Sequence, residues 1–141
     1  RLACARTLHD HGVPVTVLDK SRGVGGRTST RREGPWRFDH GAPQFIASDA
    51  RLLRYVDAWQ HDGVVHAQGP AFLGRDGMNA LARHLARDLT VRPGVQVTSL
   101  ARAGRVWQAT DSAGGVHEAD VLLLAVPAPQ AQALLEPVAA A

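Results

Sequence analysis

The N-terminal residues combine a short helix with a strand of the kind that is buried in a parallel sheet. Apolar residues recur at helical spacing over residues 2–11, and Gly12 ends that helix. The run that follows, residues 13–18, is nearly continuous in apolar and β-branched residues and ends in Asp19. A helix that leads directly into such a strand is the second half of a βαβ unit, so the sequence predicts an α/β fold.

A second apolar run, residues 121–126, has the same character and predicts another strand that is buried on both faces. We expect this strand to lie parallel to residues 13–18 in one sheet. Residues 95–118 alternate with a period of two between glycine turns, which predicts a three-stranded meander across one face of that sheet. The Ala/Leu/Gln-rich residues from 130 onward predict a helix.

Two further helices are predicted in the middle of the chain. Residues 49–61 have an apolar face and begin at Asp49, a residue type that caps helices. Residues 78–89 carry leucines at four-residue steps. We expect residues 46–90 to form a helical insertion that leads toward a substrate domain outside this chain.

Composition narrows the function classes. The net charge of +3 comes from scattered arginines with no block of like charges, which argues against a nucleic-acid partner, and dispersed histidines argue against a metal site. The longest apolar run is far shorter than the roughly 20 residues of a membrane helix, so we expect a cytoplasmic protein with a small-molecule substrate and no membrane partner.

The single cysteine, Cys4, is expected to be buried on the apolar side of the first helix.

The candidate ligand-binding residues follow the first predicted strand. In a dinucleotide-binding fold, an acid at this strand end accepts hydrogen bonds from ribose hydroxyls, and Asp19 occupies that place. Gly25 and Gly26 let a backbone approach a ligand closely, while Arg27 adds a guanidinium suited to phosphate oxygens. The alternatives are an ordinary acid ending a strand and a flexible glycine turn with solvated arginines.

At these residues the sequence resembles the flavin-dependent amine oxidase superfamily, and within it the renalase-like branch. Asp19 followed by residues 25–30 (GGRTST) is similar to the superfamily pattern after the second strand. Residues 38–45 (FDHGAPQF) resemble a segment of the renalase-like branch, with Pro43 as an intrusion. Residues 77–82, the predicted meander and residues 124–129 extend the resemblance along nearly the whole chain.

This resemblance implies an incomplete Rossmann-like FAD-binding domain, spanning residues 1–141, with FAD as its cofactor. It implies roles for eight residues: the adenosine ribose at Asp19 with Lys20 beside it, the pyrophosphate and flavin at Gly25, Gly26 and Arg27, the isoalloxazine ring at Gln44 and Phe45, and adenine at the backbone of Val97. No catalytic residue and no metal ligand is assigned. Arg1 stands where the last glycine of the family fingerprint would fall, so we expect the first strand and that fingerprint to be missing.

The implied reaction is transfer of a hydride from a dihydronicotinamide-type or amine substrate to FAD and on to oxygen. We expect the chain by itself to be inactive and to hold FAD weakly. Two alternatives stay open, namely an NAD(P)-dependent Rossmann dehydrogenase and a non-catalytic nucleotide-binding module. The oligomeric state is not predicted.

Overall fold

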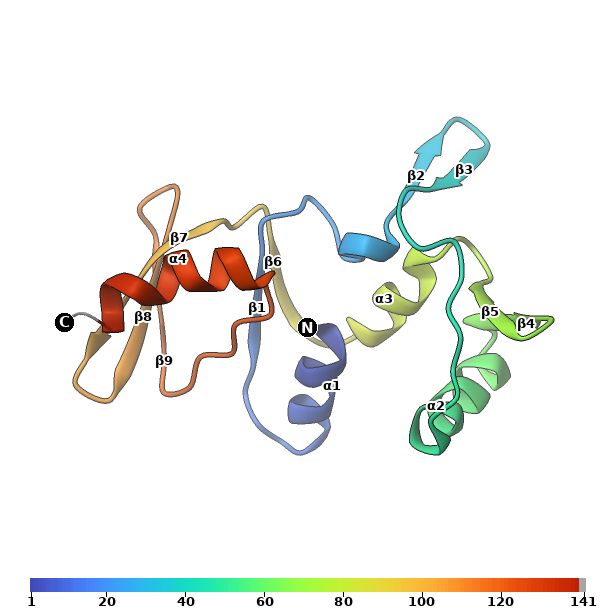
Figure 1. The fold of residues 1–141 in the computed structure, drawn as a ribbon, viewed down its shortest axis with the longest axis horizontal. Helices are drawn as coiled ribbons and strands as arrows, with labels where there is room; N and C mark the ends of the chain where they lie inside the picture. The colour runs from blue at the N-terminus through green and yellow to red at the C-terminus, as the bar shows by residue number, and fades with distance from the viewer. Residues whose placement is uncertain (140–141) are drawn as a thin grey trace.

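A parallel pair of strands occupies the middle of the computed structural model, which describes residues 1–139 (Figure 1). Strand β1 (Thr16–Asp19) pairs with β6 (Thr90–Pro93). Helix α1 (Leu2–Asp10) contacts both β1 and helix α3 (Asn79–Leu85). The predicted α/β character, with a helix leading into a parallel strand, is therefore confirmed.

The face of α1 that meets β1 and α3 carries Ala5, which is buried, and leaves Cys4 exposed. The prediction that Cys4 is buried was wrong. Successive helix residues are about 100° apart around the axis, so the residue beside a buried alanine can point to solvent even in an apolar stretch.

A small hydrophobic core lies at one end of the molecule, between helix α2 (Ala50–His61) and the hairpin of β4 (Val65–Gln68) and β5 (Ala71–Gly74). Val56, Val64 and Val65 are buried there. Asp49 caps α2 as predicted, because its carboxylate accepts hydrogen bonds from the N–H groups of Arg51 and Leu52. The segment 46–90 thus holds the two predicted helices and a hairpin that the sequence analysis did not anticipate.

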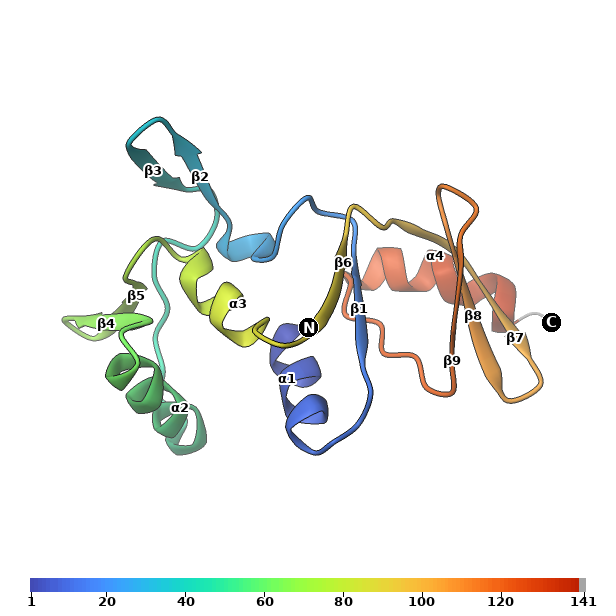
Figure 2. The same ribbon diagram turned by 180° about the vertical axis from the view of Figure 1, so that it is seen from behind.

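A second hairpin projects from the body of the molecule, as Figures 1 and 2 show from opposite sides. It consists of β2 (Thr30–Glu33) and β3 (Trp36–Asp39), and it follows the short 3-10 helix η1 (Gly26–Thr28). β3 alternates aromatic and charged residues, whereas β2 is polar and charged throughout, and most side chains of both strands are exposed. Trp36 and Phe38 are among the exposed side chains.

The C-terminal part forms the predicted antiparallel meander of β7 (Val97–Ala103), β8 (Val106–Asp111) and β9 (Val116–Ala119). Helix α4 (Ala128–Ala139) follows the segment after the meander and packs against β7. The meander lies beside the β1–β6 pair and not across its face (Figures 1 and 2), which corrects the expected placement.

Residues 121–126 do not form a strand, so the prediction that they pair in parallel with residues 13–18 was wrong. β1 pairs with β6 instead, and no strand within residues 1–139 lies alongside 121–126 to form a ladder. The side chains of Val121 and Leu123 are 73% and 60% exposed. An apolar run predicts burial, but a strand also needs a neighbour for its backbone N–H and C=O groups.

Among the helices of residues 1–139, none combines the length and the apolar character that crossing a membrane requires.

Candidate functional site

Asp19 lies at the carboxyl end of β1, the edge of a parallel sheet where ligands of open α/β folds bind. The residue is only 3% exposed. Its Oδ1 accepts a hydrogen bond from the Ser21 N–H at 2.9 Å, and its Oδ2 lies 2.8 Å from the Arg1 guanidinium. The carboxylate is thus held in place by the chain after it and balanced by one nearby cation.

The glycine turn lies next to this carboxylate. Gly25 has a φ of 132° and Gly26 a φ of 52°, which are backbone conformations that favour glycine. The N–H and the hydroxyl of Thr28 both donate to the Gly25 carbonyl at 3.0 Å and close the turn. A Cβ placed on Gly26 would meet only the Arg1 guanidinium, at 3.7 Å. The same cation therefore lies between Asp19 and Gly26.

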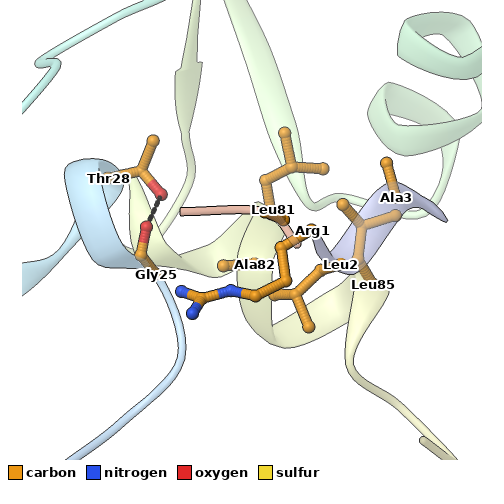
Figure 3. A pocket seen from close by; sticks show the side chains of 9 residues that line it. Arg1, Leu2, Ala3, Gly25, Thr28, Leu81, Ala82 and Leu85 are labelled. Atoms are coloured by element: carbon orange, nitrogen blue, oxygen red, sulfur yellow. Dashed lines mark hydrogen bonds between the residues drawn. The ribbon is translucent and has the colours of Figure 1, made fainter. Parts of the chain in front are cut away.

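A hollow of about 340 Å³ adjoins the turn, and Figure 3 shows the Arg1 side chain extending across it toward Gly25. Its walls come from the start of α1, the glycine turn, one face of α3 and Ala125 in the segment before α4. This volume is within the range of small-molecule sites. Glycine backbone on one side and leucine side chains on the other give the hollow a polar wall and an apolar wall.

The structure brings together only part of the predicted site. Lys20 follows Asp19 and is exposed, and Arg27 is exposed within η1. Gln44 is exposed and does not line the hollow, while Phe45 packs with Phe72 at a ring separation of 5.5 Å, against the core beside α2.

Val97 is half-buried at the start of β7, opposite Asp111 in the meander. Two residues before it, the Val95 N–H donates to the Asp19 carbonyl at 3.0 Å, so the chain leading into β7 adjoins the strand end that carries Asp19. The predicted adenine contact of Val97 stays a prediction. The roles of the other predicted site residues likewise stay predictions.

Sequence reasoning missed two features of this region. The Thr28 hydroxyl closes the glycine turn, although the sequence analysis gave that residue only a place in a motif. Thr30 and Asp39 hydrogen-bond to the backbone at the start of α3, across separations of 49 and 39 residues. The resemblance of residues 38–45 and 77–82 to one family pattern was the only available signal that these segments belong together.

Comparison with known families agrees with this geometry. Residues 2–59 match the NAD(P)-binding Rossmann-like domain, which contains α1, β1 and the glycine turn. Residues 52–141 match the flavin containing amine oxidoreductase family, which is more than half of the chain.

The chain belongs to the flavin containing amine oxidoreductase family. Membership identifies the protein as a flavin-dependent oxidoreductase, as the sequence predicted. It also favours that prediction over a nicotinamide-dependent dehydrogenase. A flavin amine oxidoreductase with a Rossmann-like N-terminal region agrees with the parallel β1–β6 pair and with the buried acid at its edge.

Proposed function

We propose that this flavin amine oxidoreductase uses FAD and is renalase-like, taking a hydride from a dihydronicotinamide-type or amine substrate and passing the electrons to oxygen. The observation that carries the choice of FAD is the burial of Asp19 beside the Gly25–Gly26 turn. A ribose acid next to a phosphate-binding backbone suits an adenine dinucleotide, whereas a mononucleotide flavin has no adenosine ribose to occupy it.

The residues present fit such a group. Asp19 Oδ2 can accept from ribose hydroxyls, since its present partner is a single guanidinium. A Cβ on Gly26 would meet only the end of the Arg1 side chain, at 3.7 Å, so the Gly26 backbone can be reached by phosphate oxygens, and the exposed Arg27 can donate to them. Lys20 adds a second exposed cation next to Asp19.

FAD, when bound, would accept the hydride from the substrate and pass the two electrons to oxygen, which gives hydrogen peroxide. The contribution of this chain is to bind and orient that group. The renalase-like assignment is supported by residues 38–45 and 77–82, and we propose small molecules as the only partners of this site.

The cofactor is tested on the purified protein that contains this chain. Flavin released by denaturation should chromatograph as FAD. Asp19→Asn should lower flavin retention after dialysis, because the amide keeps the acceptor for Ser21 but replaces the second carboxylate oxygen. Asp62→Asn, at the exposed end of α2, is the matched control and should retain flavin. Release of FMN alone would contradict the FAD assignment, and equal retention in both variants would contradict the role of Asp19.

The substrate class is tested by anaerobic mixing with dihydronicotinamide isomers and, separately, with primary amines. Bleaching of the visible flavin band by the dihydronicotinamides, followed by peroxide formation when oxygen is admitted, is the expected result. Bleaching by amines alone would retain the family function and reject the renalase-like assignment.

A further inference from the structure

The Asp39 carboxylate joins the base of the β2–β3 hairpin to the start of α3. Its Oδ1 accepts hydrogen bonds from the Thr30 hydroxyl at 2.5 Å and from the Met78 N–H at 2.9 Å. The Thr30 Oγ1 accepts in turn from the Asn79 N–H at 3.2 Å. Since Thr30 and Asp39 are opposite each other in the hairpin, one carboxylate and one hydroxyl together hold two backbone N–H groups of a distant segment.

Backbone hydrogen bonds also join the hairpin base to the glycine turn. The His40 N–H donates to the Ser29 carbonyl at 2.9 Å, and the Ala42 N–H donates to the Arg27 carbonyl at 2.9 Å. The residues that follow Asp39 are therefore bonded to those that follow Gly26. Two backbone hydrogen bonds thus connect the segment after Asp39 to Arg27 and Ser29.

The packing at this junction leaves little room for adjustment. A Cβ on Gly77 would lie 2.6 Å from the Thr30 side chain, and a Cβ on Gly41 would lie 1.8 Å from the Arg27 carbonyl oxygen. A Cβ on Gly25 would come within 3.4 Å of the Asn79 Cβ. The glycine turn, the hairpin base and the start of α3 thus pack so closely at these glycines that a side chain would not fit without a shift.

We propose that Asp39, acting through Thr30 and the first residues of α3, is a positioning residue that fixes the Gly25–Arg27 turn for FAD. This inference rests on the proposed function. Asp39 acts as a hydrogen-bond acceptor, because its partners here are a hydroxyl and an amide N–H. The negative charge itself is therefore dispensable, and an amide oxygen can replace the carboxylate oxygen.

The test compares four variants of the protein that contains this chain: Asp39→Ala, Asp39→Asn, Thr30→Val and Thr30→Ser. FAD affinity is measured by quenching of flavin fluorescence, and the setting of the bound flavin by its visible circular dichroism. Asp39→Ala and Thr30→Val should each weaken binding by about tenfold or more and alter the dichroism, whereas Asp39→Asn and Thr30→Ser should stay within about threefold of wild type. The double variant Asp39→Ala/Thr30→Val should be no weaker than the worse single variant.

Glu33→Ala is the control, because Glu33 lies on the same hairpin and its exposed carboxylate pairs with Arg31 on the same strand. Hydrogen exchange of the Met78 and Asn79 amides, measured without flavin, reports the contact directly, and Asp39→Ala should lose protection there while Glu33→Ala keeps it. Where Asp39→Ala does not fold, Asp39→Asn and the two Thr30 variants decide the question.

The positioning role alone would be overturned by wild-type FAD affinity in Asp39→Ala and Thr30→Val, or by an Asp39→Asn variant as weak as Asp39→Ala. Unchanged protection at Met78 and Asn79 would do the same. A wild-type protein that binds no FAD would overturn both this inference and the proposed function, which distinguishes the two failures.

Discussion

At the residue scale, Arg27 is exposed immediately after the two glycines of the turn. Under the proposed function, the Arg27 guanidinium donates charge-assisted hydrogen bonds to phosphate oxygens of FAD. Such bonds contribute roughly 1.5 to 3 kcal/mol, so we expect Arg27→Ala to weaken FAD binding by about tenfold to a hundredfold. Arg27→Lys should recover part of the loss, because it restores the charge without the planar fork. Equilibrium dialysis against free FAD measures the change.

Arg22→Ala is the matched control for this prediction, since Arg22 is an exposed arginine of the same loop that precedes the glycines. Equal weakening in the two variants would show a general effect of positive charge and would reject a specific contact at Arg27.

Asp111 gives a pH dependence at the same scale. A hydrogen bond from His117 and others from the Gly115 and Ala113 N–H groups hold the pKa of Asp111 below its ordinary 3.8, against the opposing effect of burial. A carboxyl with a lowered pKa in the folded state stabilises that state above its unfolded pKa, and the stabilisation is lost as pH falls through the folded pKa. Asp111→Asn should therefore destabilise the meander at neutral pH.

The difference between wild type and Asp111→Asn should shrink as the pH falls below about 4. Urea unfolding followed by the fluorescence of Trp107, which lies in β8 of the same sheet, measures it. A difference in stability that stays constant from pH 7 to pH 3 would show that the charge of Asp111 has no part in it.

At the scale of elements, Gly77 lies just before α3 and packs directly against Thr30 of β2. The φ of Gly77 is 94°, and an added Cβ would lie 2.6 Å from the Thr30 side chain. Gly77→Ala therefore combines an unfavourable backbone conformation with overpacking, which typically costs about 1 to 3 kcal/mol more. We expect its thermal unfolding midpoint to fall further than that of a variant carrying the backbone penalty alone.

Gly69→Ala supplies that comparison, because Gly69 has a φ of 58° and nothing within 4 Å of an added Cβ. Equal losses in the two alanine variants would mean that α3 can move away from β2 without cost.

The elements that could be predicted from the sequence are those with a clear local period. Residues 50–61 have an apolar face and a capping acid, and β1 follows its helix directly. The β2–β3 hairpin could not be recognised, because β2 is polar throughout and the alternation in β3 covers only four residues, all of them exposed. The strand predicted at residues 121–126 is absent for the opposite reason. Their apolar character is clear, but a strand also needs a neighbouring strand to pair with.

The same division applies to the site. Asp19 and the glycine turn could be found because residue type and a short spacing carry the signal. The contacts of Thr30 and Asp39 with α3 join residues that are far apart in the chain, and no local pattern encodes such a meeting.

At the scale of the whole molecule, the exposed surface is large for the chain's mass. The accessible area is 9600 Å² for 15.0 kDa, whereas a compact monomer of this mass exposes about 7000 Å². The excess comes from separate small sheets and from exposed apolar side chains such as Trp36, Ile46 and Val121. We expect the isolated 141-residue chain to unfold at low denaturant concentration and to associate.

Light scattering during size-exclusion chromatography, with binding of an apolar dye as a second probe, measures this association. Trp36→Ser and Val121→Ser should each reduce it. A monomer that binds no dye and unfolds in one sharp transition would contradict the expectation.

The close approach of backbone at Gly41, Gly74 and Gly77 also determines how the protein can vary. A Cβ at Gly41 or Gly74 would lie 1.8 or 2.2 Å from a carbonyl oxygen, distances that no rotamer change relieves. In a randomised library selected for flavin binding, these positions should return glycine almost alone. Gly23, with nothing within 4 Å of an added Cβ and no positive φ, should accept many residues. We therefore expect the junction between the glycine turn and α3 to tolerate few substitutions at these glycines.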